Sequence, residues 1–181
     1  YLLGIKTLDV DICTNALPKE LCNIFKTNSQ SNSYGGFNLK IKNYNIDITT
    51  YRKELKYVKR KPIKIAYINN LEDDISRRDF TINAICMDKN EKIIDLVEGV
   101  ADIKRNLIRI IGEPKEKLQE DPLRILRAIR FATILDFELD KELAKEIKEN
   151  YKLVKELSNE RIKQELNKIL MNKNFLKGLN L

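Results

Sequence analysis

LDVDI at residues 8–12 alternates apolar side chains with Asp9 and Asp11. A period of two residues is typical of a β-strand with one buried face. Side chains two residues apart on a strand lie on the same side, with Cα atoms about 6–7 Å apart. The two carboxylates are therefore placed to bind a hard cation such as Mg2+. Alternating aspartates are also typical of the solvated face of an edge strand, so the stretch alone leaves both interpretations open.

Further strand patterns follow in the first half of the chain, at residues 37–41, 44–51 and 63–68. In the second of these, Asp47 lies on the polar side of the alternation. A third carboxylate on a neighbouring strand would complete a two-metal centre for phosphoryl or nucleotidyl transfer. A plain surface role for Asp47 fits the pattern equally well.

The second half of the chain is helical in pattern. Helices are expected at residues 122–135, 140–150 and 159–171. We therefore place a boundary near residue 112, between a strand-rich part at 1–112 and a helical part at 113–181.

The composition excludes several classes of catalysis and indicates the kind of partner. The 34 lysines and arginines exceed the 27 acidic residues, and the net charge of +7 favours a nucleic acid or nucleotide partner. With no histidine, His-ligated zinc and Ser-His-Asp hydrolysis are excluded, and catalysis must rest on carboxylates. No apolar run approaches the ~20 residues of a membrane span. Three widely spaced cysteines predict thiols in a reducing compartment, so we expect a cytoplasmic protein that does not enter a membrane.

The arginines are clustered in a lysine-rich chain. Five of the ten are Arg77, Arg78, Arg124, Arg127 and Arg130. A guanidinium presents a planar fork of donors that suits phosphate groups and base edges. The alternative is a set of ion pairs with neighbouring carboxylates, such as Asp73, Asp74 and Glu120.

The segment RRDFTINAI, residues 77–85, resembles a hallmark of the class II tRNA nucleotidyltransferases and the related bacterial poly(A) polymerases. Other segments are similar to motifs of the same family and occur in the family's order. They are LDVDICTNA at 8–16, IDITTYR at 46–52, EDPLR at 120–124, and SNERI at 158–162 with Glu165 and Leu166 downstream. Together these matches cover nearly the whole chain.

The resemblance implies an α+β fold with two parts. The first is a nucleotidyltransferase (DNA polymerase beta-like) head with a mixed sheet, at 1–112, and the second is an all-helical neck that recognises the base, at 113–181. Family members begin the head with a Gly-Gly-x-Val-Arg-Asp segment, and this chain starts just after the place where that segment should lie. We therefore expect a head and neck fragment whose head is incomplete at its N-terminal side.

The resemblance also assigns roles to the carboxylates. Asp9 and Asp11 would hold two Mg2+ ions, with Asp47 as a third catalytic carboxylate. The implied reaction is attack of a tRNA 3′-hydroxyl on the α-phosphorus of CTP or ATP, with release of pyrophosphate. Expected partners are thus the tRNA 3′ end, CTP and ATP, and no obligate protein partner is inferred.

Nucleotide recognition is expected to rest on seven residues. Arg78, Asp79 and Asn83 match the motif that fixes the sugar, and residues 79 and 83 would share one face of a helix. Asp121 and Arg124 match the pair that reads the base, since a carboxylate and a guanidinium together suit both cytosine and adenine. Asp121 before Pro122 is also what a helix N-cap looks like. The remaining two are Arg127 and Arg130.

Two further regions have expected roles. Residues 52–64 hold seven basic side chains and one acid, which suits a flexible basic strap near tRNA or the triphosphate. The region of Asp95, Gly99 and Asp102 resembles the family's hinge between head and neck. We predict addition of C and/or A to tRNA. Poly(A) synthesis by the same family, a non-catalytic RNA-binding fragment and a metal-dependent phosphohydrolase remain as alternatives.

Overall fold

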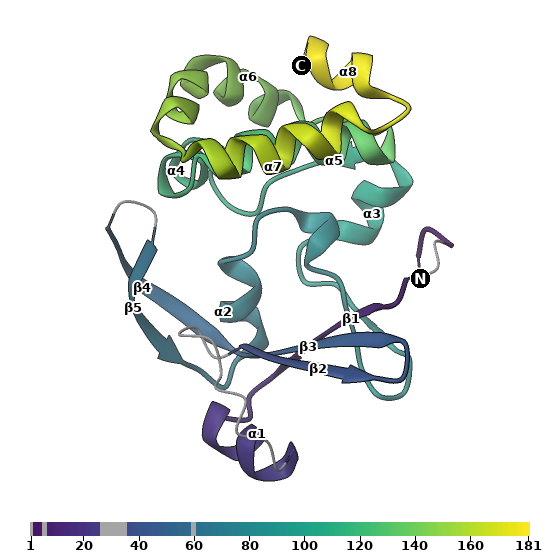
Figure 1. Cartoon of the computed structure of the whole chain (residues 1–181), viewed down its shortest axis with the longest axis vertical. Helices are drawn as coiled ribbons and strands as arrows, with labels where there is room; N and C mark the ends of the chain where they lie inside the picture. Colours follow the sequence, from purple (N-terminus) through teal and green to yellow (C-terminus); the bar gives the residue numbers. More distant parts are fainter. Residues whose placement is uncertain (1, 5–6, 26–35, 59–60) are drawn as a thin grey trace. The chain divides into compact units, whose positions relative to one another are not determined.

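The computed structural model describes residues 2–4, 7–25, 36–58 and 61–181 (Figure 1). The chain divides into two compact units, Tyr1–Asp74 and Ile75–Leu181. In the described ranges, no helix is long and apolar enough to cross a lipid bilayer.

A mixed sheet forms the first unit, as predicted. In the described part of this unit its strands are β1 (Asp9–Thr14), β3 (Tyr44–Thr50) and β2 (Gly36–Ile41), in the order β1-β3-β2 (Figure 1). Strand β1 runs parallel to β3, and β2 runs antiparallel to it. The central position of β3 therefore brings the acidic stretch of β1 beside Asp47.

The apolar face of this sheet carries the small core of the first unit. Phe37 of β2 and Ile48 of β3 are register partners and are almost fully buried. Leu21 of helix α1 (Pro18–Phe25) packs against both. Because successive side chains of a strand point to opposite faces, the acidic residues lie on the other face of the sheet.

The basic run at 52–64 forms a hairpin where the sequence suggested a flexible strap. Strand β4 (Arg52–Val58) pairs antiparallel with β5 (Lys61–Tyr67), from Arg52 opposite Tyr67 to Val58 opposite Lys61. Pairing satisfies the backbone donors and acceptors that a loose strap would leave to water. Residues 59 and 60 lie outside the described ranges.

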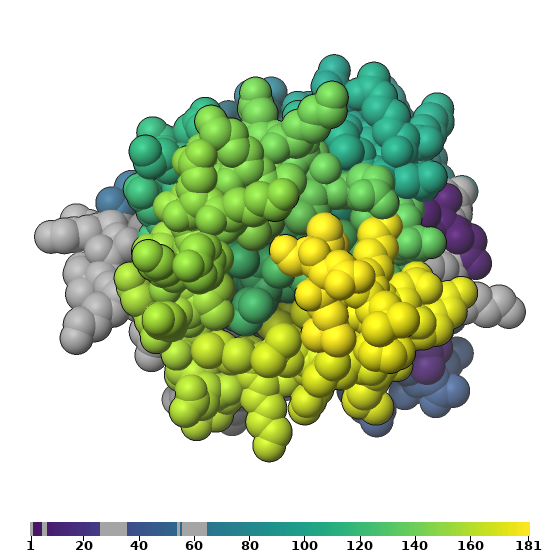
Figure 2. Space-filling model, turned by 90° about the horizontal axis from the view of Figure 1, so that it is seen from above, coloured from purple at the N-terminus to yellow at the C-terminus, as the bar shows by residue number. Residues whose placement is uncertain are grey.

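The second unit is mainly helical. The last turn of α2 (Leu71–Ser76) leads into it, and its further elements are η1 (Thr81–Asn83), β6 (Cys86–Met87), β7 (Ile93–Ile94), α3 (Gly99–Lys104), β8 (Leu107–Ile108), α4 (Pro114–Glu120), α5 (Leu123–Leu135), β9 (Glu138–Leu139), α6 (Lys141–Asn150), η2 (Tyr151–Glu156), α7 (Asn159–Leu170) and α8 (Phe175–Asn180). Figure 2 shows the side of this unit on which α6, α7 and α8 lie at the surface. The helices expected at 122–135, 140–150 and 159–171 are confirmed as α5, α6 and α7.

One hydrophobic core joins residues on both sides of position 112. Phe80 and Ile108 pack with Leu118, Ile125 and Leu143, and all five are buried. Strand β8 also pairs in parallel with β9, so the region after residue 113 is helical except for these two residues of strand. The compact units therefore divide at 74/75, while the functional boundary expected near residue 112 stays a prediction.

Helix α8 lies against α5 and α7 at a glycine. A Cβ added to Gly178 would lie 2.5 Å from Cγ2 of Ile169 and would also collide with Oγ1 of Thr133. Both neighbours are β-branched and cannot easily change rotamer. The absence of a side chain at this position therefore allows α8 to dock.

Replacing this glycine tests the close approach. Gly178→Ala is expected to lower the free energy of unfolding by about 1 kcal/mol, because overpacking costs about 1–3 kcal/mol and helix propensity returns about 1 kcal/mol. Urea unfolding measures the change. The double variant with Thr133→Ala removes one colliding side chain, so the two losses should be less than additive. Full additivity would contradict the contact.

Candidate active site

Three carboxylates gather on the polar face of the first unit's sheet. Asp11 of β1 is the register partner of Asp47 of β3, and Asp9 lies two residues before Asp11 on the same face. All three side chains are exposed. The structure thus brings together the three residues that the sequence predicted as catalytic.

Two asparagines on this face hold the carboxylates by hydrogen bonds. The Nδ2 of Asn45 donates to Oδ1 of Asp9 at 2.9 Å, and the side-chain amide of Asn38 donates to Oδ1 of Asp47. Neither asparagine was predicted from sequence. Alternation places each on the polar face of its strand, but only the strand register shows which carboxylate it contacts.

The donor set suits Mg2+. Carboxylate oxygens are the ligands that this ion prefers, and it commonly takes one or two of them together with waters and substrate phosphates. Among the described residues, no group of three or more acidic, cysteine or histidine side chains is arranged to enclose a metal ion by itself. No cation in the described part of the chain is paired with Asp9, Asp11 or Asp47. The sheet therefore offers an open, two-carboxylate type of site at residues 9 and 11.

A second group of predicted residues meets around Asp79 in the second unit. Its Oδ1 accepts hydrogen bonds from Nδ2 of Asn83 at 3.2 Å and from the backbone N–H of Phe80 at 2.8 Å. Its Oδ2 accepts from Nε of Arg127 at 2.7 Å and also from Nη2. The carbonyl oxygen of Asn83 accepts from Nη1 of Arg78 at 3.4 Å.

The sequence suggested that Asp79 and Asn83 share one face of a helix. This prediction is wrong, because no α-helix contains both residues. Helix α2 ends at Ser76, and Asn83 belongs to the 3₁₀ turn η1. Phe80 between them is extended, at φ −117° and ψ 147°, and forms a β-bridge with Ile110. The tight turn brings the two side chains together instead.

An aromatic ring lies under two of the predicted arginines. The Cζ atoms of Arg127 and Arg130 lie 5.4 Å and 4.2 Å from the ring centroid of Phe131. Phe131 packs edge-on against Phe80, with 5.6 Å between ring centroids. Both guanidiniums are therefore held against a surface that attracts cations.

Arg130 forms a nearly buried ion pair with a residue that sequence reasoning did not include in the site. Its Nε lies 2.7 Å from Oε2 of Glu165 on α7, and only 12% and 8% of the two side chains is exposed. Burial lowers the pKa of Arg130, and the neighbouring Glu165 carboxylate offsets part of that effect. Glu165 lies in the segment similar to the last family motif, but only the packing of α5 against α7 shows its partner.

The predicted base-reading pair lies at the start of α5, with Asp121 just before the helix and Arg124 as its second residue. Arg124 is 6% exposed, and its guanidinium donates to Oε2 of Glu120 at 3.0 Å and to the carbonyl oxygen of Lys117 at 2.7 Å. Oδ1 of Asp121 accepts from the N–H of Leu123 at 3.1 Å. The N-cap of α5 is Pro122, so the prediction of Asp121 as the N-cap is wrong, although its side chain accepts this N–H of the first helical turn. Base reading by this pair stays a prediction.

Each of the three α5 arginines pairs with a carboxylate from a different segment. The pairs are Arg124 with Glu120, Arg127 with Asp79, and Arg130 with Glu165. The ion-pair alternative raised from sequence is thus correct for Glu120. An arginine that is paired with a carboxylate can also bind phosphate, because a guanidinium carries five N–H donors.

The Glu120 pair predicts a dependence of stability on pH. Burial alone would raise the pKa of Glu120, but hydrogen bonds from Arg124 and Lys117 outweigh it and hold the pKa below its ordinary value of 4.5. A pKa that is lower in the folded state stabilises the fold above the unfolded pKa, and this stability is lost as the pH falls through the folded pKa. Glu120→Gln is therefore expected to lower the free energy of unfolding at about pH 7 and to approach the wild type at about pH 3.

Urea unfolding across that range measures the difference. Glu116→Gln on the exposed side of the same helix is the matched control, and it should show little difference from the wild type at either pH. A difference for Glu120→Gln that stays constant from neutral to acid pH would contradict the pairing.

The sheet and the second unit together define an α+β nucleotidyltransferase fold. Residues 1–109 match the family model described as "Poly A polymerase head domain", and residues 136–181 match one described as "Probable RNA and SrmB- binding site of polymerase A". The chain belongs to the poly A polymerase head domain family. The resemblance stated from the sequence motifs is thereby confirmed.

Several relatives of this chain are CCA-adding enzymes. The chain is 41% identical over 180 residues to the CCA-adding enzyme of Ligilactobacillus salivarius (strain UCC118), covering 98% of this chain and 45% of that protein. It is 39% identical over 176 residues to the CCA-adding enzyme of Staphylococcus haemolyticus (strain JCSC1435), covering 96% and 44%. The chain thus spans a little under half the length of these relatives.

Solved structures of similar proteins support the assignment of the chain to this family. The Bacillus stearothermophilus CCA-adding enzyme in complex with CTP is similar with a TM-score of 0.89 and 35% identity, covering 98% of this chain and 43% of that one. A tRNA nucleotidyltransferase complexed with a primer tRNA and an incoming ATP analog is similar with a TM-score of 0.79 and 32% identity, covering 99% and 52%. The α+β fold class predicted from the sequence is confirmed.

Proposed function

We propose that this chain is the head and neck part of a tRNA nucleotidyltransferase that adds C and/or A from CTP and ATP to the tRNA 3′ end. The observation that supports this most is the register of the first sheet, which sets Asp11 beside Asp47 with Asp9 on the same face. Oxygen donors in that arrangement suit nucleotidyl transfer. Relatives whose structures contain CTP, or a primer tRNA with an ATP analog, support the choice of substrates.

Asp9 and Asp11 are the proposed ligands of Mg2+. When bound there, the ion would lower the pKa of the attacking 3′-hydroxyl and neutralise charge on the triphosphate. The protein's own contribution is orientation: the amides of Asn45 and Asn38 fix the carboxylates of Asp9 and Asp47 before substrate arrives. Such preorganisation lowers the cost of reaching the transition state.

The second unit is proposed to hold the incoming nucleotide. Arg78, Asp79 and Asn83 would bind the sugar, because their donors and acceptors can bond a ribose hydroxyl. Asp121 and Arg124 would read the base. The remaining positive charges of the cluster are Arg127 and Arg130, whose pairing with carboxylates and with Phe131 keeps them in place.

Two further expectations belong to the same proposal. The functional boundary between head and neck lies near residue 112, so that nucleotide transfer and base reading are assigned to its two sides. The location is the cytoplasm, on the argument from three widely spaced cysteines.

Extension of defined tRNAs tests the function. With the chain in its full reading frame, Mg2+ and labelled CTP or ATP, we expect tRNAs that lack CCA, CA or the final A all to be completed. Extension of only some of these ends would identify a CC-adding or A-adding enzyme. Long adenylate tails on unrelated RNA would identify a poly(A) polymerase, the second candidate, which the match to the poly A polymerase head domain favours. No extension of any RNA by the folded protein would reject the enzymatic proposal.

A further inference from the structure

We infer that Thr81, Asp102 and Arg109 form a buried polar support that positions Asp79 and Asn83, and that this support sets how strongly the site prefers ribonucleotides over deoxyribonucleotides. The inference rests on the proposed function, in which residues 79 and 83 bind the sugar. The three supporting residues do not touch the nucleotide in this account, so they are positioning residues.

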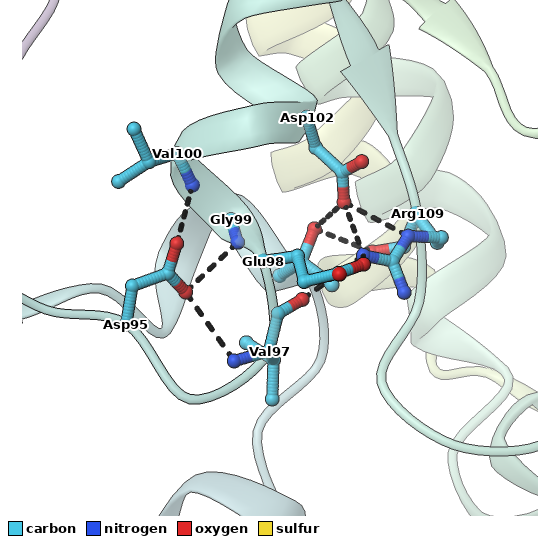
Figure 3. A network of polar contacts seen from close by, with 8 residues as sticks. Asp95, Val97, Glu98, Gly99, Val100, Asp102 and Arg109 are labelled. Carbon is cyan, nitrogen blue, oxygen red and sulfur yellow. Dashed lines mark hydrogen bonds and ion pairs between the residues drawn. The ribbon is translucent and has the colours of Figure 1, made fainter.

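A single carboxylate oxygen joins the three side chains. Asp102 on α3 is fully buried, and its Oδ2 accepts from Oγ1 of Thr81 at 2.7 Å. The same oxygen accepts from Nε of Arg109 at 2.9 Å (Figure 3). Nη2 of Arg109 also donates to the carbonyl oxygen of Val97 at 2.9 Å. The support thus links η1, α3 and the residue that directly follows β8.

The loop that leads into α3 is fixed at the same place. Both carboxylate oxygens of Asp95 accept backbone N–H groups, from Gly99 at 2.9 Å and Val100 at 2.8 Å among others (Figure 3). A Cβ at Gly99 would lie 2.8 Å from Cγ1 of Ile85 and would collide with the carbonyl oxygen of Thr81. Helix α3 can therefore approach the first residue of η1 only because position 99 has no side chain.

Thr81 lies between the two sugar-binding candidates and controls the turn that joins them. Its N–H donates to the carbonyl oxygen of Arg109 at 3.0 Å, and its own carbonyl oxygen accepts from Ala84 at 3.1 Å. The second bond closes the 3₁₀ turn that carries Asn83. On the other side, the carbonyl oxygen of Asp79 accepts from the N–H of Ile111 at 2.9 Å. The backbone from 79 to 84 is thus held by its pairing with 109–111 and by the Thr81 hydroxyl.

The burial of Asp102 indicates that this network does more than fill space in the core. A buried carboxylate is costly to desolvate unless it is paired, and Oδ1 of Asp102 accepts no hydrogen bond from any residue in the described ranges. Apolar side chains would fill this space at less cost. A directional acceptor, by contrast, sets the position of the Thr81 hydroxyl and hence of the turn.

Single-nucleotide addition with ribose and deoxyribose substrates tests the inference. For the full-length enzyme, kcat/KM is measured with CTP and with dCTP on a tRNA that lacks CCA. Thr81→Val keeps the side-chain shape but removes the hydroxyl, and it is expected to lower the CTP/dCTP ratio by about tenfold or more. Thr81→Ser keeps the hydroxyl and is the matched control, with a ratio near that of the wild type.

Asp102→Asn keeps an acceptor for Thr81 but removes the charge that pairs with Arg109. It is expected to lower the ratio less than Thr81→Val does, and it carries the test if the valine variant does not fold. Equal losses with CTP and dCTP, or a lower thermal midpoint with an unchanged ratio, would overturn the inference and leave a purely structural role. A wild type that extends no tRNA would reject the proposed function and this inference with it. An active wild type whose variants keep the same CTP/dCTP ratio would reject the inference alone.

Discussion

The double variant Asp9→Asn with Asp11→Asn is expected to lose at least about a thousandfold of the rate of nucleotide addition, because a metal contributes several kcal/mol of charge stabilisation and each 1.4 kcal/mol is about a factor of ten. Asparagine keeps the size of the side chain but removes the negative charge that holds Mg2+. The rate of single-nucleotide addition to tRNA, measured under saturating substrate across a range of Mg2+ concentrations, gives the result.

Controls separate loss of metal from loss of fold. Both side chains are exposed, so thermal unfolding of the double variant should match the wild type. Glu142→Gln, an acid on the first turn of α6, is the matched control and should keep full activity. Asp47→Asn alone reports on the third carboxylate. Retention of activity within about tenfold of the wild type by the double variant would remove Asp9 and Asp11 from the catalytic role.

Asp121→Asn is expected to reduce the preference for CTP over UTP by about a hundredfold. The carboxylate can only accept hydrogen bonds, which suits the amino group of cytosine or adenine. The amide of asparagine can also donate, so it can bond the carbonyl group of uracil. The ratio of kcat/KM for the two nucleotides, on a tRNA that lacks CCA, measures the change.

The same substitution separates base reading from the hydrogen bond that Asp121 accepts from Leu123. Asparagine retains an oxygen that can accept from Leu123, so the free energy of unfolding should hardly change. Asp121→Ala removes this acceptor and should cost about 1 kcal/mol of stability. If Asp121→Asn leaves the preference unchanged and Asp121→Ala only destabilises, the hydrogen bond to Leu123 is the whole role of this residue.

Periodicity predicted the strands and the longest helices, because those elements repeat an apolar pattern over several residues. The alternation in residues 8–12 placed Asp9 and Asp11 on one face, and the structure agrees. The short helices α4 and α8 were missed, since each has only six or seven residues and little room for a pattern. The strand expected at 63–68 is confirmed as β5, but β4 was missed and read as part of a strap because basic side chains hide its alternation.

The sequence predicted which residues belong to the site better than it predicted the contacts between them. A period of two predicts which face of its strand carries Asp47. Its position beside Asp11 depends on the register between β1 and β3, which pairs residues 36 positions apart in the sequence. The Arg130–Glu165 pair depends likewise on how α5 packs against α7, which no local pattern encodes. Asp79 and Asn83 were placed together for a reason that proved wrong, since a 3₁₀ turn rather than an α-helix joins them.

The arginines of α5 have a geometric consequence for changes in chain length. They recur every third residue, and each residue of an α-helix turns the side-chain direction by about 100°. Successive arginines therefore step by about 60° around the axis, which lets one helix reach carboxylates on three separate segments. A single residue inserted between Arg127 and Arg130 would rotate the latter by about 100° away from Glu165. Deletions and insertions should thus be far less tolerable within α5 than in the loops that flank it.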